Sequence, residues 1–307
     1  MHWPSWHASL GPMTCWKVSG VGRRLRWLLT ALMVCAVCAA GASAQARFRL
    51  ADRAVIEAHL KSFSTRNSER EATIRKWFAE SGCKDSNLSE EPLERKLPPN
   101  VICVLPGKTQ EVIVVGAHTD HVDSFGDGVV DNWTGASLLP SLLYSLSGQS
   151  RRHTFVFVGF AAEEEGLVGS AYYAEHLTPE QRTRVEAMVN MDSLGLTPTK
   201  VWASHADKAL LDALASVASA NGLPLAAVNV EGLGTADSES FARYQIPHIT
   251  LHSVTPETWP ILHSVRDQLN AVNMKDYYDS YRLIAAYLAY LDGVLGKPAA
   301  RADKTAR

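Results

Sequence analysis

The chain has 307 residues, of which 46% are hydrophobic and 20% charged, so it can bury a large core and is neither disordered nor a small disulfide-dense scaffold. Four of its 30 basic residues and none of its 32 acidic residues lie within residues 1–44, so the remainder has 26 basic and 32 acidic residues and a net charge of −6. A chain this acidic has no general attraction for phosphate backbones, and we therefore expect no nucleic-acid partner.

Residues 1–44 have the pattern of a signal peptide. Three arginines within residues 23–26 precede an apolar run at 27–40, and the small residues at 42–44 fit a cleavage site after Ala44. The apolar run has about 14 residues, whereas a membrane-spanning helix needs about 20, so a retained anchor is the less favoured alternative. We expect a periplasmic or secreted protein with no stable membrane partner.

Cleavage at this position would leave two cysteines, Cys83 and Cys103, because the other three lie within residues 1–44. An oxidising compartment favours the pairing of two thiols. We therefore predict a disulfide bond between them, and two separate buried cysteines are the alternative.

Short apolar runs rich in β-branched residues alternate with helical patterns along the rest of the chain. In chain order, we expect a helix at 69–81, strands at 101–105 and 112–116, a helix at 135–146, strands at 154–160 and 185–191, a helix at 208–220, a strand at 248–251 and a helix at 274–295. This alternation predicts a layered α/β/α fold. No linker divides it, so we expect one domain over residues 45–295, followed by a flexible tail at 296–307.

Histidines and acidic residues follow the ends of several predicted strands, where α/β folds place their ligands. They are His118, Asp120, Glu163, Glu164 and Asp192, and to them we add Asp131, which opens a predicted helix, and His263, which lies in a late loop. Each residue alone has an ordinary alternative, such as a helix N-cap for Asp131. Together, however, adjacent carboxylates would repel one another unless a cation neutralises them. Imidazole and carboxylate ligands suit Zn²⁺, and Co²⁺ or Mn²⁺ could substitute for it.

Five short motifs carry these residues. They are Gly-Ala-His-Thr-Asp at 116–120, Asp-Asn-Trp-Thr-Gly at 131–135, Ala-Glu-Glu-Glu-Gly-Leu-Val-Gly-Ser at 162–170, Asn-Met-Asp at 190–192 and His-Ser-Val-Arg-Asp at 263–267. In this order and spacing, they resemble the M28 family of di-zinc metallopeptidases, the group of aminopeptidase Y and the bacterial leucyl aminopeptidases. The resemblance spans most of the mature chain, and it implies a phosphorylase/hydrolase-like zinc exopeptidase fold with a mixed, mostly parallel central sheet.

The resemblance also implies a role for each site residue. It implies two zinc ions per chain, with ligands at His118, Asp131, Glu164, Asp192 and His263. Asp131 would bridge the two ions, and a cis peptide bond would join it to Asn132. Glu163 would be the general base, and Asp120 would orient the imidazole of His118.

Elementary chemistry agrees with these roles. A carboxylate that accepts the second N–H of an imidazole fixes its tautomer, so Asp120 can act without touching the metal. The two ions would lower the pKa of a shared water, and Glu163 would take its proton and pass it to the leaving amine. Because Glu163 and Glu164 are consecutive, their side chains point in different directions, and one can bind metal while the other faces the water.

The sequence departs from the family pattern in three places. Val130 precedes Asp131 where many members carry a second acid, which leaves the bridging carboxylate in place. Trp133 replaces a small residue, and its indole would either line the substrate pocket or be structural. The stretch at 237–241 stands where members have a Ser-Asp-His signature, and because the histidine is missing we assign this stretch no catalytic role.

The leading functional hypothesis is a zinc-dependent aminopeptidase that hydrolyses N-terminal residues from peptide substrates. One alternative is a glutaminyl-peptide cyclotransferase, which resembles this family and uses a single zinc. A second alternative is a non-catalytic binding protein, although all five ligand positions are filled. A serine hydrolase of the α/β type and a zincin are excluded, because the sequence has neither Gly-x-Ser-x-Gly nor His-Glu-x-x-His.

Overall fold

The computed structural model describes residues 48–94, 97–123, 126–232 and 234–296. The predicted signal peptide lies outside these ranges, and so does the predicted tail apart from residue 296. Within the described ranges, none of the helices combines the length and the apolar character that crossing a membrane requires.

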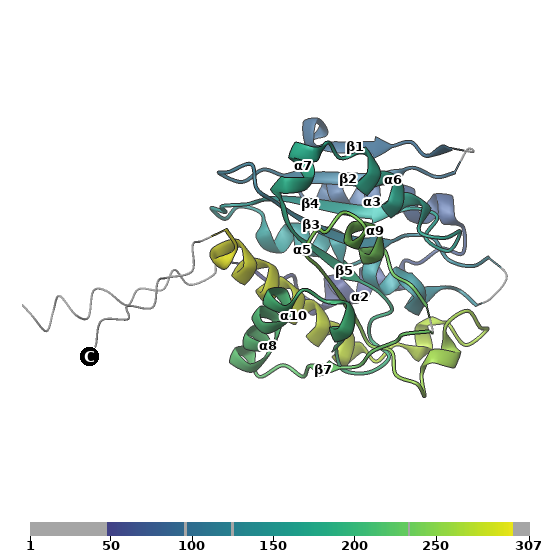
Figure 1. Ribbon diagram of the computed structural model, residues 1–307. Coiled ribbons are helices and arrows are strands. Elements are labelled where there is room, and N and C mark those ends of the chain that lie inside the picture. The colour runs from purple at the N-terminus through teal and green to yellow at the C-terminus, as the bar shows by residue number, and fades with distance from the viewer. Residues whose placement is uncertain (1–47, 95–96, 124–125, 233, 297–307) are drawn as a thin grey trace, which may run out of the picture. The chain divides into compact units, whose positions relative to one another are not determined.

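Eight strands of the described chain form one mixed sheet, in the order β1-β2-β4-β3-β5-β8-β6-β7 (Figure 1). Their bounds are β1 Leu88–Glu91, β2 Asn100–Leu105, β3 Val112–His118, β4 Thr154–Phe160, β5 Val185–Met191, β6 Lys200–Val201, β7 Ala226–Ala227 and β8 His248–His252. The four central strands, β4, β3, β5 and β8, are parallel to one another. Strands β1 and β2 on one side and β6 on the other pair in antiparallel fashion with their inner neighbours.

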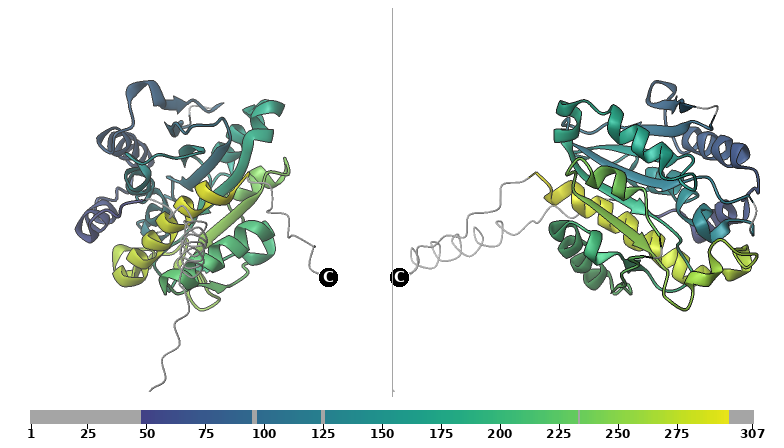
Figure 2. Two further views of the ribbon diagram at one scale, coloured as in Figure 1. Left: turned by 90° about the vertical axis from the view of Figure 1, so that its left-hand side faces the viewer. Right: turned by 45° about the vertical axis from the view of Figure 1, so that its right-hand side comes forward.

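Helices cover both faces of this sheet (Figure 2). The larger core on one face includes α2 (Arg53–Lys61), α3 (Asn67–Glu80), α5 (Leu139–Leu146), α8 (Lys208–Asn221) and α10 (Met274–Val294). The smaller core on the other face includes α6 (Val168–His176) and α9 (Ser238–Ala242). The short helices α4 (Thr134–Ala136) and α7 (Pro179–Arg184) lie between these elements in the chain. The three layers confirm the predicted α/β/α fold with a mixed, mostly parallel sheet.

Strands β3 and β4 are nearly continuous apolar runs because both of their faces are buried. In β3, Ile113 and Val115 belong to the larger core, whereas Val114 belongs to the smaller one. In β4, Phe157 and Val158 divide between the two cores in the same way. This pattern follows from the two-residue period of a strand, which points successive side chains to opposite faces.

The predicted strands are all present, and those at 154–160 and 185–191 have the predicted bounds. The predicted helix at 135–146 is divided into α4 and α5. The edge strand β1 was not predicted, because its Leu-Ser-Glu-Glu sequence has no apolar run, and β6 and β7 are only two residues long.

A disulfide bond joins Cys83, just after α3, to Cys103 in β2, with 6.1 Å between the two Cα atoms. Both cysteines are buried in the larger core. The predicted pairing is confirmed, and it fastens α3 covalently to the sheet.

Candidate metal centre

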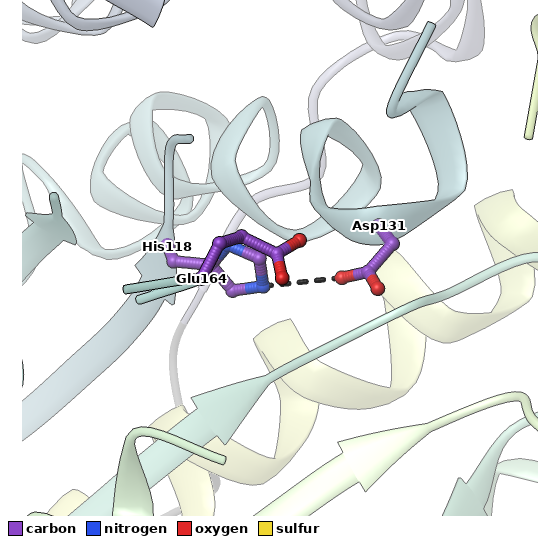
Figure 3. A group of neighbouring side chains, drawn as sticks. All are labelled: His118, Asp131 and Glu164. Carbon is purple, nitrogen blue, oxygen red and sulfur yellow. Dashed lines mark ion pairs between the residues drawn. The ribbon is translucent and has the colours of Figure 1, made fainter. Parts of the chain in front are cut away.

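The predicted site residues meet at one edge of the sheet because the central strands are parallel and end on the same side. His118 is the last residue of β3, and Asp192 directly follows β5. Glu163 and Glu164 follow β4 after two intervening residues. Figure 3 shows how His118, Asp131 and Glu164 approach one another at this edge.

The side chain of Asp131 lies between two imidazoles. Its Oδ1 is 3.2 Å from Nε2 of His118, and its Oδ2 is 3.2 Å from Nε2 of His263. Each histidine also has a second carboxylate nearby. Asp192 Oδ1 is 3.9 Å from His118 Nε2, and Glu164 Oε2 is 3.0 Å from His263 Nε2. The five predicted ligands therefore form two sets that share Asp131.

These residues fit a divalent metal. One ligand atom each from His118, Asp131 and Glu164 lie within 4.8 Å of one another. The second oxygen of Glu164, Oε1, is buried and has no hydrogen-bond partner among the described residues. A cation would satisfy this oxygen, and nitrogen and oxygen donors of this kind are usual zinc ligands.

The backbone around Asp131 is irregular and is held by the next side chain. A cis peptide bond joins Asp131 to Asn132, as the family resemblance implied. The side-chain amide of Asn132 donates to the carbonyl of Met191 at 2.9 Å, and its Oδ1 accepts the N–H of Gly135 at 2.9 Å and that of Ser193 at 3.2 Å. Asn132 therefore ties the segment that carries Asp131 to the end of β5, where Asp192 lies.

Asp120 contacts the glutamates more closely than the imidazole that we expected it to orient. Its Oδ1 and Oδ2 accept the main-chain N–H groups of Glu163 and Glu164, each at 3.1 Å. His118 Nδ1 lies 3.2 Å from the main-chain oxygen of Asp120 and 3.6 Å from its Oδ1. The carboxylate of Asp120 thus positions the glutamate pair, and its carbonyl oxygen is the nearer partner of His118.

The density of carboxylates shifts the pKa values of the site in the metal-free protein. Burial lowers the pKa of His118, but Glu163 and the other carboxylates outweigh it and hold that pKa well above 6.5. Burial raises the pKa of Glu163, and this effect is opposed by His118 and reinforced by Asp237 and Asp192. Burial also raises the pKa of Asp131, but its hydrogen bonds with His118 and His263 outweigh this effect and hold that pKa below its ordinary value. A bound cation would favour the charged carboxylates and the neutral histidines.

A cavity of about 250 Å³ opens beside these residues. Its lining includes the five predicted ligands and Glu163, whereas the next glutamate, Glu165, is exposed and lies outside the lining. The other walls are mostly apolar and include Trp202, Val230, Val254, Trp259 and Leu262. No local pattern indicates the two tryptophans, because Trp202 directly follows the two-residue strand β6 and Trp259 begins a three-residue 3-10 helix.

Two further residues of the motifs have clear positions. Trp133 is fully buried, is absent from the cavity lining and donates its indole N–H to the carbonyl of His59 at 3.1 Å, so it is a structural residue. Asp267, to which we assigned no role of its own, is buried and accepts the N–H groups of Val130 and Asp131 at 2.6 and 3.1 Å.

Comparison with known proteins gives partial matches. An aminopeptidase of Pseudomonas aeruginosa is 35% identical over 89 residues, which are 29% of this chain and 16% of that protein. Among solved structures, BSAP, a zinc aminopeptidase from Bacillus subtilis, has a TM-score of 0.57 and 24% identity over 62% of this chain and 49% of its own. A glutaminyl cyclase from an Acidobacteriales bacterium has a TM-score of 0.59 and 17% identity over 72% of this chain and 85% of its own. The two structural matches establish the fold alone, and the match to the Pseudomonas relative spans a small part of that protein's length.

Residues 100–288 match peptidase family M28. This range is more than half of the chain and contains all five motifs and the seven predicted site residues. The chain therefore belongs to peptidase family M28.

Proposed function

We propose that this protein is a zinc-dependent exopeptidase, an aminopeptidase that hydrolyses N-terminal residues from peptides and holds two zinc ions. The observation that carries the proposal is the position of Asp131, whose two oxygens face two different histidines, each with a second carboxylate. His118 and Asp192 would hold one ion, and His263 and Glu164 the other. Asp131 would bridge them.

Glu163 is the residue we assign to proton transfer. When bound, zinc would polarise the scissile carbonyl and lower the pKa of a nearby water. Glu163 lines the cavity, and Asp120 accepts its main-chain N–H, which supports a role for its carboxylate in accepting a proton and returning it to the leaving amine. Asp120 is a positioning residue in this scheme, because its carboxylate contacts the backbone of both glutamates.

The cavity walls favour an apolar N-terminal side chain. Apart from the proposed ligands and Glu163, the only titratable side chain in the lining is His252. Its Nε2 lies 2.9 Å from the carbonyl of Val228, and its Nδ1 accepts the N–H of Val254 at 3.1 Å, so the imidazole is neutral. No fixed charge in these walls would therefore pair with a charged side chain of the substrate.

Metal analysis combined with a substrate panel tests the proposal. We expect two zinc ions per chain and release of arylamine from aminoacyl-arylamides, fastest for apolar residues. One zinc per chain with cyclisation of an N-terminal glutaminyl peptide would instead identify a glutaminyl cyclase. A protein that binds no metal and turns over neither substrate would be a binding protein derived from the fold.

We also propose that residues 1–44 are a signal peptide, that residues 45–295 are one metallopeptidase domain, and that the mature protein is periplasmic or secreted. The disulfide bond supports this location, because such bonds persist in oxidising compartments. N-terminal sequencing of the protein recovered from each cell fraction and from the medium tests it. We expect a chain that starts at Gln45 outside the cytoplasm, and an intact N-terminus in the membrane fraction would indicate an anchor.

A further inference from the structure

Arg70 is a fully buried arginine on α3, outside the residues that match the family. Among the described residues, its guanidinium donates only to main-chain carbonyls. Nε donates to Ser64 at 2.6 Å, Nη1 to Thr119 at 3.4 Å, and Nη2 to Asp127 and to Gly128, the latter at 3.0 Å. Thr119 directly follows the predicted ligand His118, and Gly128 lies three residues before Asp131. One side chain therefore fastens both of these loops to α3.

The positive charge of Arg70 is balanced by carboxylates that do not contact it directly. Among the described residues, no carboxylate lies close enough to form an ion pair with it. Burial lowers the pKa of Arg70 to about 10, and this effect is opposed by the negative charges of Asp267, Asp120 and Asp131. The guanidinium is charged at neutral pH and is therefore a permanent cation beside a cluster of acids. It stabilises that cluster even when no metal is bound.

Asp267 accepts hydrogen bonds from the main-chain N–H groups of the same segment, residues 126–131. Its carboxylate accepts the N–H groups of Val130 and Asp131, and its main-chain oxygen accepts that of Asp127 at 2.8 Å. Asp267 lies four residues after His263, so one loop supplies a predicted ligand and also holds the backbone of Asp131. Arg70 donates hydrogen bonds to carbonyl groups of this segment, and Asp267 accepts hydrogen bonds from its N–H groups.

Two glycines allow the segment to lie this close to its neighbours. Gly126 has a φ of +65°, and a Cβ there would lie 2.4 Å from the carbonyl oxygen of Ser264. Gly128 has a φ of +56°, and a Cβ there would lie 2.3 Å from the Cβ of His121. Both values are too short for any side chain, so residues 126–131 are confined on several sides.

We propose that Arg70 and Asp267 are positioning residues of the metal centre, which fix residues 126–131 so that the two oxygens of Asp131 face His118 and His263. This inference rests on the proposed function. The proposal assigns α3 a role in positioning the metal ligands, although α3 lies outside the residues that match the family. Groups that orient a ligand in this way typically change metal affinity by about 10- to 100-fold when they are replaced.

Two variants test the proposal. Arg70→Lys keeps the positive charge but replaces the planar fork of donors with one ammonium group, which cannot reach both loops. Asp267→Asn keeps the shape of the side chain but turns one acceptor into a donor that opposes a main-chain N–H.

The chain offers a matched control for each variant. Asp292 also accepts two consecutive N–H groups, those of Arg152 at 3.0 Å and His153 at 2.7 Å, and it lies on α10 outside the candidate site. Arg75 lies on α3 like Arg70, but it is exposed and forms an ion pair with Glu90 at 2.8 Å. Asp292→Asn and Arg75→Lys therefore report general effects of each substitution on stability.

The measurement is calorimetric titration of the metal-free proteins with Zn²⁺, together with the absorption spectrum of the Co²⁺-loaded forms and thermal unfolding with and without Zn²⁺. We expect Arg70→Lys and Asp267→Asn to bind Zn²⁺ about 10- to 100-fold more weakly, with an altered Co²⁺ spectrum and a smaller rise in Tm on adding Zn²⁺. We expect both controls to bind Zn²⁺ with the affinity and the spectrum of the wild type, whatever their Tm.

Each other outcome has a defined meaning. If wild-type protein binds no Zn²⁺, the proposed function fails. If wild type binds it and the folded variants show wild-type affinity and spectrum, only the inference about Arg70 and Asp267 is overturned. If one variant does not fold, the other decides, and if neither folds, the two residues are determinants of folding and the positioning role is rejected.

Discussion

Replacing Glu163 by glutamine should remove activity without removing metal. Glutamine has nearly the same shape, but it cannot accept a proton from water, and a positioned general base contributes about two to four powers of ten in rate. We therefore expect kcat to fall about 100- to 10,000-fold, which corresponds to about 2.7 to 5.4 kcal/mol of activation free energy. Zinc content should be unchanged, because the proposed ligands of both ions remain.

The same substitution should leave the metal-free protein at least as stable as the wild type. Burial, together with the carboxylates of Asp237 and Asp192, raises the pKa of Glu163 above its ordinary value of 4.5. A carboxyl group with a raised pKa in the folded state lowers the free energy of unfolding as the pH rises above 4.5. Glutamine does not ionise, so the Glu163→Gln variant should lose less stability than the wild type between pH 5 and pH 8.

The two following glutamates supply the controls. Glu165 is exposed and lies outside the cavity lining, so Glu165→Gln should keep both activity and metal. Glu164 lies 3.0 Å from His263, so Glu164→Gln should lose zinc as well as activity.

The assay for all three variants combines kcat on an apolar aminoacyl-arylamide, elemental analysis of zinc, and urea unfolding of the metal-free protein at pH 5 and pH 8. A Glu163→Gln variant that keeps more than about a tenth of wild-type kcat would show that another group is the base. Parallel loss of zinc and activity in that variant would show that Glu163 is a ligand.

Three further predictions concern the metal, the disulfide and pH. Removing metal with a chelator should abolish activity. It should also lower the free energy of unfolding by about 4 kcal/mol relative to protein with free zinc at 1,000 times its Kd. A chelated protein that keeps full activity would contradict the metal assignment. Replacing Cys83 and Cys103 by alanine should lower the free energy of unfolding by about 3 kcal/mol in urea, because the bond closes a loop of 20 residues; an unchanged urea midpoint would refute this. Burial lowers the pKa of His153, but Asp292 and Glu186 outweigh this effect and raise that pKa above 6.5. The ion pairs of protonated His153 therefore stabilise the folded protein fully below pH 6.5, and this stabilisation is lost as the pH rises through the raised pKa. His153→Gln should therefore cost more stability at pH 6 than at pH 9, and an equal loss at both would contradict the ion pairing.

The fold and the proposed ligands could be predicted because their signals are local. Strand β3 ends at His118, β4 ends three residues before Glu163, and Asp192 directly follows β5, so parallel strands bring these ends together without further information. The contacts that support the ligands are different, because they join distant positions. Arg70 and Gly128 are 58 positions apart, and Asp267 and Val130 are 137 apart. No spacing in the sequence indicates such pairs.

The acceptor role of Asp120 shows the same limit on a smaller scale. Its oxygens reach Glu163 and Glu164 because β3 and β4 are adjacent in the sheet, although these residues are 43 and 44 positions apart in the chain. The family resemblance implied the imidazole of His118 as the partner of Asp120, and no local pattern in the sequence indicated the two glutamates.

The covalent link between the end of α3 and β2 also bears on how the protein withstands proteases. The chain between the two cysteines contains β1, a four-residue strand at the edge of the sheet with two exposed residues. A protease that cuts the main chain anywhere between Cys83 and Cys103 would separate no fragment, because the disulfide would still join the two pieces. The helix that carries Arg70 would then stay attached to the sheet, and a single cut in this stretch would leave the molecule in one piece.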